Sequence, residues 1–153
     1  AGDIADLGRI TVRVPLRTLT APRVEHPSSV NLGDQVNLIG YDLSSEKLAP
    51  GASLTVTLHW QARREMVGDY KVFVHLLDAT GRLMVGSDAI PADWTRPTTG
   101  WIAGEYVADA HTLPLPANLA LGDYRLEAGL YDAESNVRLG ESVLLDQIVV
   151  IAP

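Results

Sequence analysis

The stretch "SLTVTLHWQ", residues 53–61, decides the fold class of this chain. Its apolar side chains occupy every second position, whereas serine, threonine, histidine and glutamine occupy the positions between them. Successive side chains of a β-strand point to opposite faces, so this alternation predicts a strand that is buried on one face and polar on the other. The predicted inward set is Leu54, Val56, Leu58 and Trp60.

The same two-residue period recurs along most of the chain, and helical periodicity is nearly missing. Turn-forming stretches separate the apolar runs: "APG" at 49–51, "DATG" at 78–81 and "AESN" at 133–136. These features predict an all-β protein, a two-sheet antiparallel immunoglobulin-like β-sandwich with less than about 10% helix. Further strands are expected at 36–43, 69–78, around 83–87, and at 106–113, 123–132 and 145–151. Outside the first strand, the predicted core includes Val72, Val74, Leu126 and Leu130.

The spacing of Leu119, Gly122 and Tyr124 suggests a tyrosine corner. In that motif the phenol hydroxyl binds a backbone group just upstream. The Tyr124 hydroxyl is therefore expected to be structural.

Composition limits the classes of partner. The chain has 153 residues, 46% of them hydrophobic, and a formal net charge of −7. One globular core is enough for this length, and the negative charge argues against nucleic acid or an anionic membrane surface as a partner. The sequence contains no cysteine and no run of 18 apolar residues, so no direct membrane insertion is expected from it.

The two ends resemble each other. "LGRITVRVP" at 7–15 and "LDQIVVIAP" at 145–153 share Leu, Ile, Val and Pro at equivalent positions. We therefore expect residues 1–31 to be the closing strand of a preceding repeat plus a linker, and residues 32–153 to be the β-sandwich domain. Residues 9–14 should form a strand that pairs with its own sandwich or with a neighbouring chain in a strand-mediated homodimer. Residues 21–29 should cross without regular structure.

No reaction can be assigned from the sequence. A "GxSxG" elbow is missing, and the four histidines have no local metal-binding spacing such as "HxH" or "HExxH". Aspartates are frequent at strand ends, where turn formation explains most of them. We predict no catalytic residues, no metal site and no cofactor.

The segment "DWTRPTTGW", residues 93–101, allows two interpretations. It could be a sugar platform, because indole rings stack on pyranose faces while nearby polar groups bind hydroxyls. Alternatively, it is a long crossover that one buried tryptophan holds down, with Trp101 as the buried ring and Trp94 as the exposed one. The candidate sugar-binding residues are Trp94, Trp101, Asp93, Arg96, Thr98 and Glu105.

Five stretches carry a resemblance to a known family: "LGDQVNLIGYDL", "PGASLTVTLHWQA", "DYKVFVHLLDATGRL", "RPTTGWIAGEYVADAHTLPLP" and "LGDYRLEAGLYD". Over residues 32–151 the chain resembles the extracytoplasmic C-terminal β-sandwich of bacterial GT-C (dolichyl-phosphate-mannose-type) membrane glycosyltransferases and related membrane proteins. It also loosely resembles the sandwich that binds O-antigen polysaccharide at the end of some ABC-transporter ATPases.

The resemblance implies a non-catalytic accessory domain of a membrane-anchored parent, outside the cytoplasmic membrane, used for spacing, docking or contact with a membrane-protein partner. No glycosyltransferase motif is carried over, so the chain itself is not expected to be an enzyme. The alternative is a carbohydrate-binding module that holds a glycan through Trp94 and Trp101.

Overall fold

A computed structural model describes residues 8–11 and 16–153 of the chain. Nine strands and one short 3-10 turn, Thr98–Gly100, are found within these residues. The strands are β1 (His26–Leu32), β2 (Val36–Leu43), β3 (Lys47–Leu48), β4 (Ser53–Ala62), β5 (Tyr70–Leu77), β6 (Leu83–Ala89), β7 (Tyr106–Pro114), β8 (Gly122–Asp132) and β9 (Val143–Val150). The predicted all-β class is confirmed.

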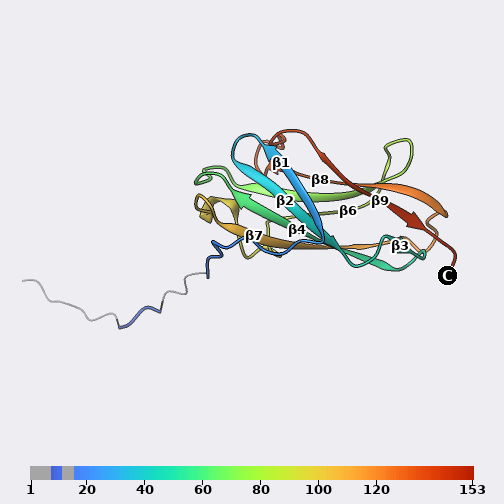
Figure 1. The fold of residues 1–153 in the computed structure, drawn as a ribbon, viewed down its shortest axis with the longest axis horizontal. Coiled ribbons are helices and arrows are strands. Elements are labelled where there is room, and N and C mark those ends of the chain that lie inside the picture. Colours follow the sequence, from blue (N-terminus) through green and yellow to red (C-terminus); the bar gives the residue numbers. More distant parts are fainter. Residues whose placement is uncertain (1–7, 12–15) are drawn as a thin grey trace, which may run out of the picture.

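The strands form two sheets that pack face to face (Figure 1). A four-stranded sheet has the order β1-β2-β4-β7, and a five-stranded sheet has the order β3-β9-β8-β5-β6. All pairs are antiparallel except the short pair β3–β9, which is parallel. The protein is an immunoglobulin-like β-sandwich, as the alternation predicts.

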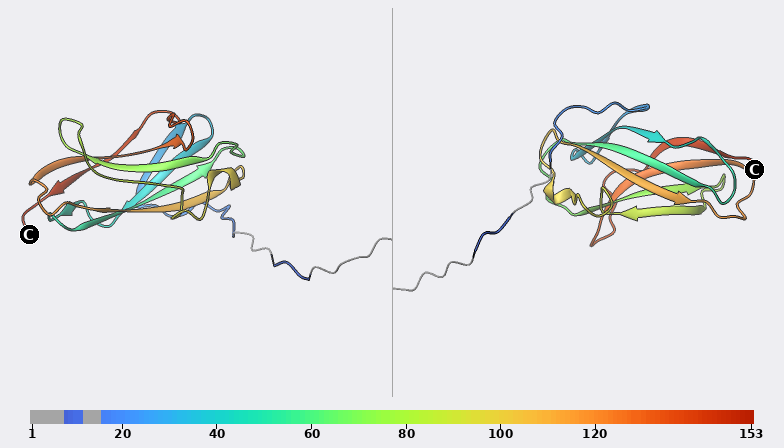
Figure 2. Two further views of the ribbon diagram at one scale, coloured as in Figure 1. Left: turned by 180° about the vertical axis from the view of Figure 1, so that it is seen from behind. Right: turned by 90° about the horizontal axis from the view of Figure 1, so that it is seen from below.

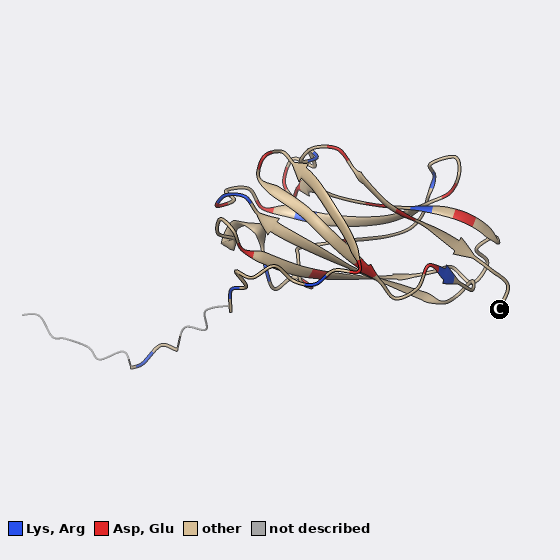
Figure 3. Ribbon diagram, in the orientation of Figure 1, with Lys and Arg blue, Asp and Glu red and all other residues tan. Residues whose placement is uncertain are grey.

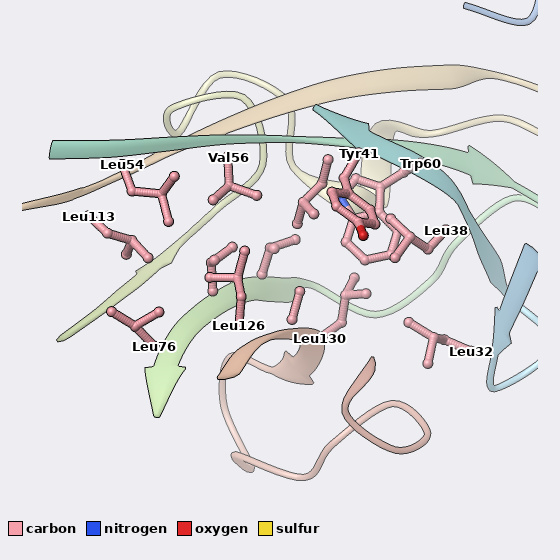
Figure 4. Packing of buried hydrophobic residues seen from close by; sticks show 14 of the residues in the cluster. Leu32, Leu38, Tyr41, Leu54, Val56, Trp60, Leu76, Leu113, Leu126 and Leu130 are labelled. Atoms are coloured by element: carbon pink, nitrogen blue, oxygen red, sulfur yellow. The ribbon is translucent and has the colours of Figure 1, made fainter. Parts of the chain in front are cut away.

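The core lies between the sheets, where side chains of β4 and of β8 point toward one another (Figure 4). The positions predicted to be buried are confirmed: Leu54, Val56, Leu58, Trp60, Val72, Val74, Leu126 and Leu130 are at most 1% exposed. The tyrosine corner is also confirmed, because the Tyr124 hydroxyl donates to the carbonyl of Ala120 at 2.8 Å.

The segment before β1 crosses the outer face of the four-stranded sheet (Figure 2). Thr18 pairs with Tyr106 at the β7 edge, whereas His26 begins β1 at the opposite edge. Between them, Val24 lies directly over Gly40. We call residues 18–25 the strap; they cover the sheet where His59 pairs with Gly40 and is only 7% exposed.

The prediction that residues 21–29 cross without regular structure is wrong from His26 onward, because β1 pairs with β2. "HPSSV" lacks the apolar alternation of the other strands, and its exposed and half-buried residues fit an edge position. The expected strand at 9–14 is not formed at residues 9–11, where Ile10 is 86% exposed, and residues 12–14 lie outside the described residues.

Charged residues of both signs are distributed along the sandwich (Figure 3). Within the described part of the chain, no helix has the length and apolar character needed to cross a bilayer.

Candidate functional site

The loop between β6 and β7 contains the predicted sugar platform, and most of that loop is anchored internally. Trp101 is 0% exposed, and its indole N–H donates to the carbonyl of Arg96 at 3.0 Å. Thr98 is also buried, and its hydroxyl accepts from the backbone N–H of Tyr70 and donates to the carbonyl of Gly68. Both residues are therefore inaccessible to a ligand.

Glu105 is the buried anchor of the same loop. It forms ion pairs with Arg96 and with Arg17, the latter at 2.7 Å, and accepts the backbone N–H of Ile102. Burial alone would raise the pKa of Glu105, but the hydrogen bonds from Arg96 and Ile102 and the charges of both arginines outweigh it and lower the pKa. The carboxylate is thus held ionised inside the protein by structural contacts.

Trp94 is the exposed ring of the loop, as expected. It is 58% exposed, and Ala92, Asp93 and Trp94 all have positive φ, between 52° and 65°. Non-glycine residues in this left-handed region are uncommon, and such strain is concentrated at functional sites. The structure therefore separates the two tryptophans: Trp94 and Asp93 face solvent, whereas Trp101, Thr98 and Glu105 are buried and Arg96 is paired with Glu105.

A shallow cavity of about 290 Å³ lies on the outer face of the five-stranded sheet. It is lined by Phe73, His75, Asp88, Tyr131, Asn136 and Arg138, which we call the aromatic cup. The Phe73 ring covers Gly129 so closely that a Cβ there would lie 2.6 Å from Cζ, and a larger residue would force the ring to shift. The Arg138 guanidinium carbon lies 4.9 Å from the Phe73 ring centroid, within cation–π distance.

The polar groups of the aromatic cup are linked to one another. His75 Nε2 and Asp88 Oδ1 are 2.9 Å apart. Burial raises the pKa of the Tyr131 hydroxyl, and the charge of Asp88 and a hydrogen bond to it raise the pKa further. Tyr131 therefore keeps its proton at neutral pH as a hydrogen-bond donor, and the cup combines ring surface with donors and acceptors.

Lys71 connects Trp94 to the strands that form the aromatic cup. Lys71 is paired with Tyr131 in the sheet, and its Nζ lies 5.5 Å from the Trp94 ring centroid. Lys71 and Phe73 alternate with the buried Val72, so both point to the outer face. An exposed indole and the cup thus share one face of the molecule.

A second polar network, which the sequence analysis missed, is buried between β6 and β7. Ser87 Oγ is 2.9 Å from His111 Nδ1, and His111 Nε2 is 2.9 Å from Asp109 Oδ2. Asp109 also accepts from Ala92 N–H at 2.8 Å and from the Trp60 indole at 3.4 Å. Both ring nitrogens and both carboxylate oxygens are engaged, and Asp109 and His111 are at most 2% exposed. We assign this serine, histidine and aspartate a structural role. The signal was the "DAH" spacing, which places the two titratable residues on one strand face.

Comparisons with known proteins identify the fold. No protein-family model matches the chain, and no curated protein matches it. Among solved structures, the C-terminal domain of Wzt is similar at 14% identity over 78% of this chain and 74% of that one, with a TM-score of 0.59.

Two further solved structures share this architecture. A family 2 glycoside hydrolase, a β-glucuronidase, matches at 11% identity and a TM-score of 0.54 over 72% of this chain but only 11% of its own length. The sporulation control protein Spo0M from Bacillus subtilis matches at 14% identity and a TM-score of 0.50 over 78% of this chain and 49% of its own. At such identities the likeness establishes a β-sandwich and nothing finer.

Proposed function

We propose that this chain is a non-catalytic accessory domain that binds carbohydrate on the outer face of its five-stranded sheet. The observation that carries the proposal is that the exposed Trp94 ring, next to Lys71, lies on the same sheet face as the aromatic cup. Sugars are bound in proteins by ring stacking together with a few hydrogen-bonding groups, and Trp94, Tyr131, Asp88 and Asn136 offer both. The site differs from the platform predicted from sequence, because Trp101 takes no part in it.

The proposed context of the domain rests on the family resemblance of its sequence. We propose that it belongs to a membrane-anchored, glycosyltransferase-like parent protein and lies outside the cytoplasmic membrane. There it would hold a glycan, or contact a membrane-protein partner, near the polysaccharide or glycolipid machinery. The similar fold in the Wzt C-terminal domain and in a glycoside hydrolase is compatible with this context.

Carbohydrate binding is tested by titrating the protein with neutral and bacterial-envelope oligosaccharides while following tryptophan fluorescence. One or two stacked rings contribute only a few kcal/mol, so we expect dissociation constants from about micromolar to millimolar. Trp94→Ala and Tyr131→Ala should each abolish saturation without lowering the melting temperature. Leu121→Ala, which removes another exposed apolar side chain, is the control and should bind like the wild type. A panel without any saturable response would refute the proposal.

The proposed location needs a separate experiment. In cells that make the natural full-length protein, the domain should be in the membrane fraction and should be digested by a protease added to intact spheroplasts. Recovery of the intact domain after this treatment would contradict an extracytoplasmic position, whatever the outcome of the glycan titration.

A further inference from the structure

Three side chains that can bind a metal meet at the edge of the sandwich, away from the aromatic cup. His26 begins β1, Asp146 lies in β9, and Glu46 precedes β3, which pairs with β9 (Figure 1). They belong to both sheets, because β1 is an edge of the four-stranded sheet while β3 and β9 are neighbours in the five-stranded sheet. A ligand shared by all three would therefore connect the sheets.

The His26 ring lies between the two carboxylates. Its Nε2 is 3.9 Å from Glu46 Oε1, and its Nδ1 is 3.9 Å from Asp146 Oδ2. Both distances exceed a hydrogen bond. One ligand atom can be taken from each side chain so that all three lie within 4.8 Å of one another. The three side chains are thus close enough to be drawn onto one ion, and no hydrogen bond between them has to be broken first.

Two of the three side chains are held in place. The His26 ring stacks on Tyr41 with centroids 4.8 Å apart and an interplanar angle of 5°. Asp146 accepts the backbone N–H of Gln147 at 2.8 Å and the Tyr41 hydroxyl at 3.2 Å. Tyr41, whose hydroxyl also donates to the carbonyl of Leu145 at 2.5 Å, thus contacts both side chains and helps to orient them, as outer-shell groups do at metal sites.

The third side chain is free to move toward the other two. Glu46 has 58% of its side-chain surface exposed. Together with His26 it lines a cavity of about 350 Å³, so ions and water can reach the site. Bound donors at about 2.0–2.2 Å from a metal lie closer together than the three do here, and rotation of Glu46 can provide that approach.

We propose that His26, Glu46 and Asp146 form a binding site for a first-row divalent transition-metal ion, of which Zn²⁺ is the natural probe. The two carboxylates match the charge of the cation, and the imidazole favours zinc-like metals over Ca²⁺ and Mg²⁺, which prefer oxygen ligands alone. Water would complete the coordination, because the cavity is open. The bound ion would link β1 to β9 and stabilise the closed edge of the sandwich. This inference is independent of carbohydrate binding.

The test is calorimetric titration of the full 153-residue chain with Zn²⁺ alone at pH 7, together with thermal melting. We expect one bound ion per chain and a melting temperature raised by roughly 5–10 °C at free Zn²⁺ about 100 times the dissociation constant. Excess Mg²⁺ should not compete. Asp146→Asn and Glu46→Gln should each weaken binding by about tenfold or more.

His75→Gln is the matched control, because His75 and Asp88 form another partly exposed histidine–carboxylate pair. It should bind Zn²⁺ like the wild type. Because Glu46 is exposed, Glu46→Gln should fold normally, so a loss of binding in this variant reports the site itself. The proposal is overturned if the wild type binds no Zn²⁺, or if Glu46→Gln and Asp146→Asn bind it as tightly as the wild type.

Discussion

Glu105 illustrates how one buried charge organises the loop that carries Trp94. Its carboxylate forms ion pairs with Arg17, from the segment before the strap, and with Arg96, from the loop. It also accepts a hydrogen bond from the backbone N–H of Ile102. The segment around Arg17 and the β6–β7 loop, which are far apart in sequence, are thus fixed at one point. The exposed Trp94 ring extends from a loop whose other end is held by this anchor.

We expect Glu105→Gln to destabilise the protein by about 3 kcal/mol at pH 7, because it leaves two guanidinium groups without their charged partner. The loss should depend on pH. The pKa of Glu105 is lower in the folded than in the unfolded state, so its stabilisation is full above the unfolded pKa of about 4.3 and disappears as pH falls through the folded pKa. Urea unfolding at pH 7 and at pH 3 should show the gap between variant and wild type shrinking.

The control is Glu65→Gln, which changes an exposed glutamate and should alter stability by less than about 0.5 kcal/mol. A stability gap for Glu105→Gln that is equally large at both pH values would show that the ion pairs are not its cause.

At the residue scale, sequence patterning predicts apolar positions better than polar ones. Trp60 is buried as expected, and of the two readings of the loop the one with Trp101 buried and Trp94 exposed is confirmed, so Trp101 is not a surface ligand. Thr98 and Glu105 were grouped with Trp94 as surface ligands, yet both are 0% exposed. Sequence alone does not reveal whether a polar side chain is hydrogen-bonded or ion-paired inside the protein, because some of its partners, such as Arg17 for Glu105 and Tyr70 for Thr98, lie far away along the chain.

At the element scale, the strap explains a glycine in the middle of β2. A Cβ on Gly40 would lie 2.7 Å from the carbonyl oxygen of His26 and 2.7 Å from Val24 Cγ2. The backbone of His26 cannot move away easily because it is paired with Tyr41 in the ladder. The close approach of strap and sheet therefore requires glycine at this position.

Gly40→Ala should destabilise the protein by about 1–3 kcal/mol through overpacking. Gly100→Ala is the matched control, since a Cβ at Gly100 meets nothing within 4 Å. Chemical denaturation of both variants measures the difference. Equal free energies of unfolding for the two variants would mean that the strap moves away from the added Cβ without loss of stability and does not constrain the sheet.

Elements with strong alternation were predicted well, and weak ones were not. The predicted strand at 36–43 matches β2, and that at 106–113 matches β7 except for one residue. β1 and β3 were missed, because Pro27, Ser28 and Ser29 interrupt the apolar pattern of β1 and β3 has only two residues. Their formation depends on pairing with β2 and β9, which no local pattern reveals.

At the scale of the whole molecule, the sequence predicts two packed sheets but not which strands are neighbours. The aromatic cup needs β5, β6 and β8 side by side, and the His26, Glu46 and Asp146 group needs β1 near β9. Both sites therefore depend on strand order. This is why the sequence indicated only Trp94 and its loop, where the candidate residues are close along the chain.

The N-terminal segment is the part of the molecule for which we predict a contact with a second copy. Ile10 and Leu16 are 86% and 94% exposed, and among the described residues the outer strands β1, β7, β3 and β6 each have one neighbouring strand in their sheets. Exposed apolar termini and open sheet edges recruit strands from other chains. We expect the full chain to form a dimer at high concentration, measured by size-exclusion chromatography with light scattering, and deletion of residues 1–15 to abolish it.

Deletion of residues 1–20 removes in addition Arg17, which binds Glu105 at 2.7 Å, and the Thr18 carbonyl, which accepts from Tyr106 at 2.8 Å. Only this longer deletion should lower the melting temperature of the monomer, by several degrees, because the strap then loses its anchor at the β7 edge. A full chain that stays monomeric at all concentrations would rule out strand exchange, and equal melting temperatures of the two deletions would show that the anchor contributes nothing.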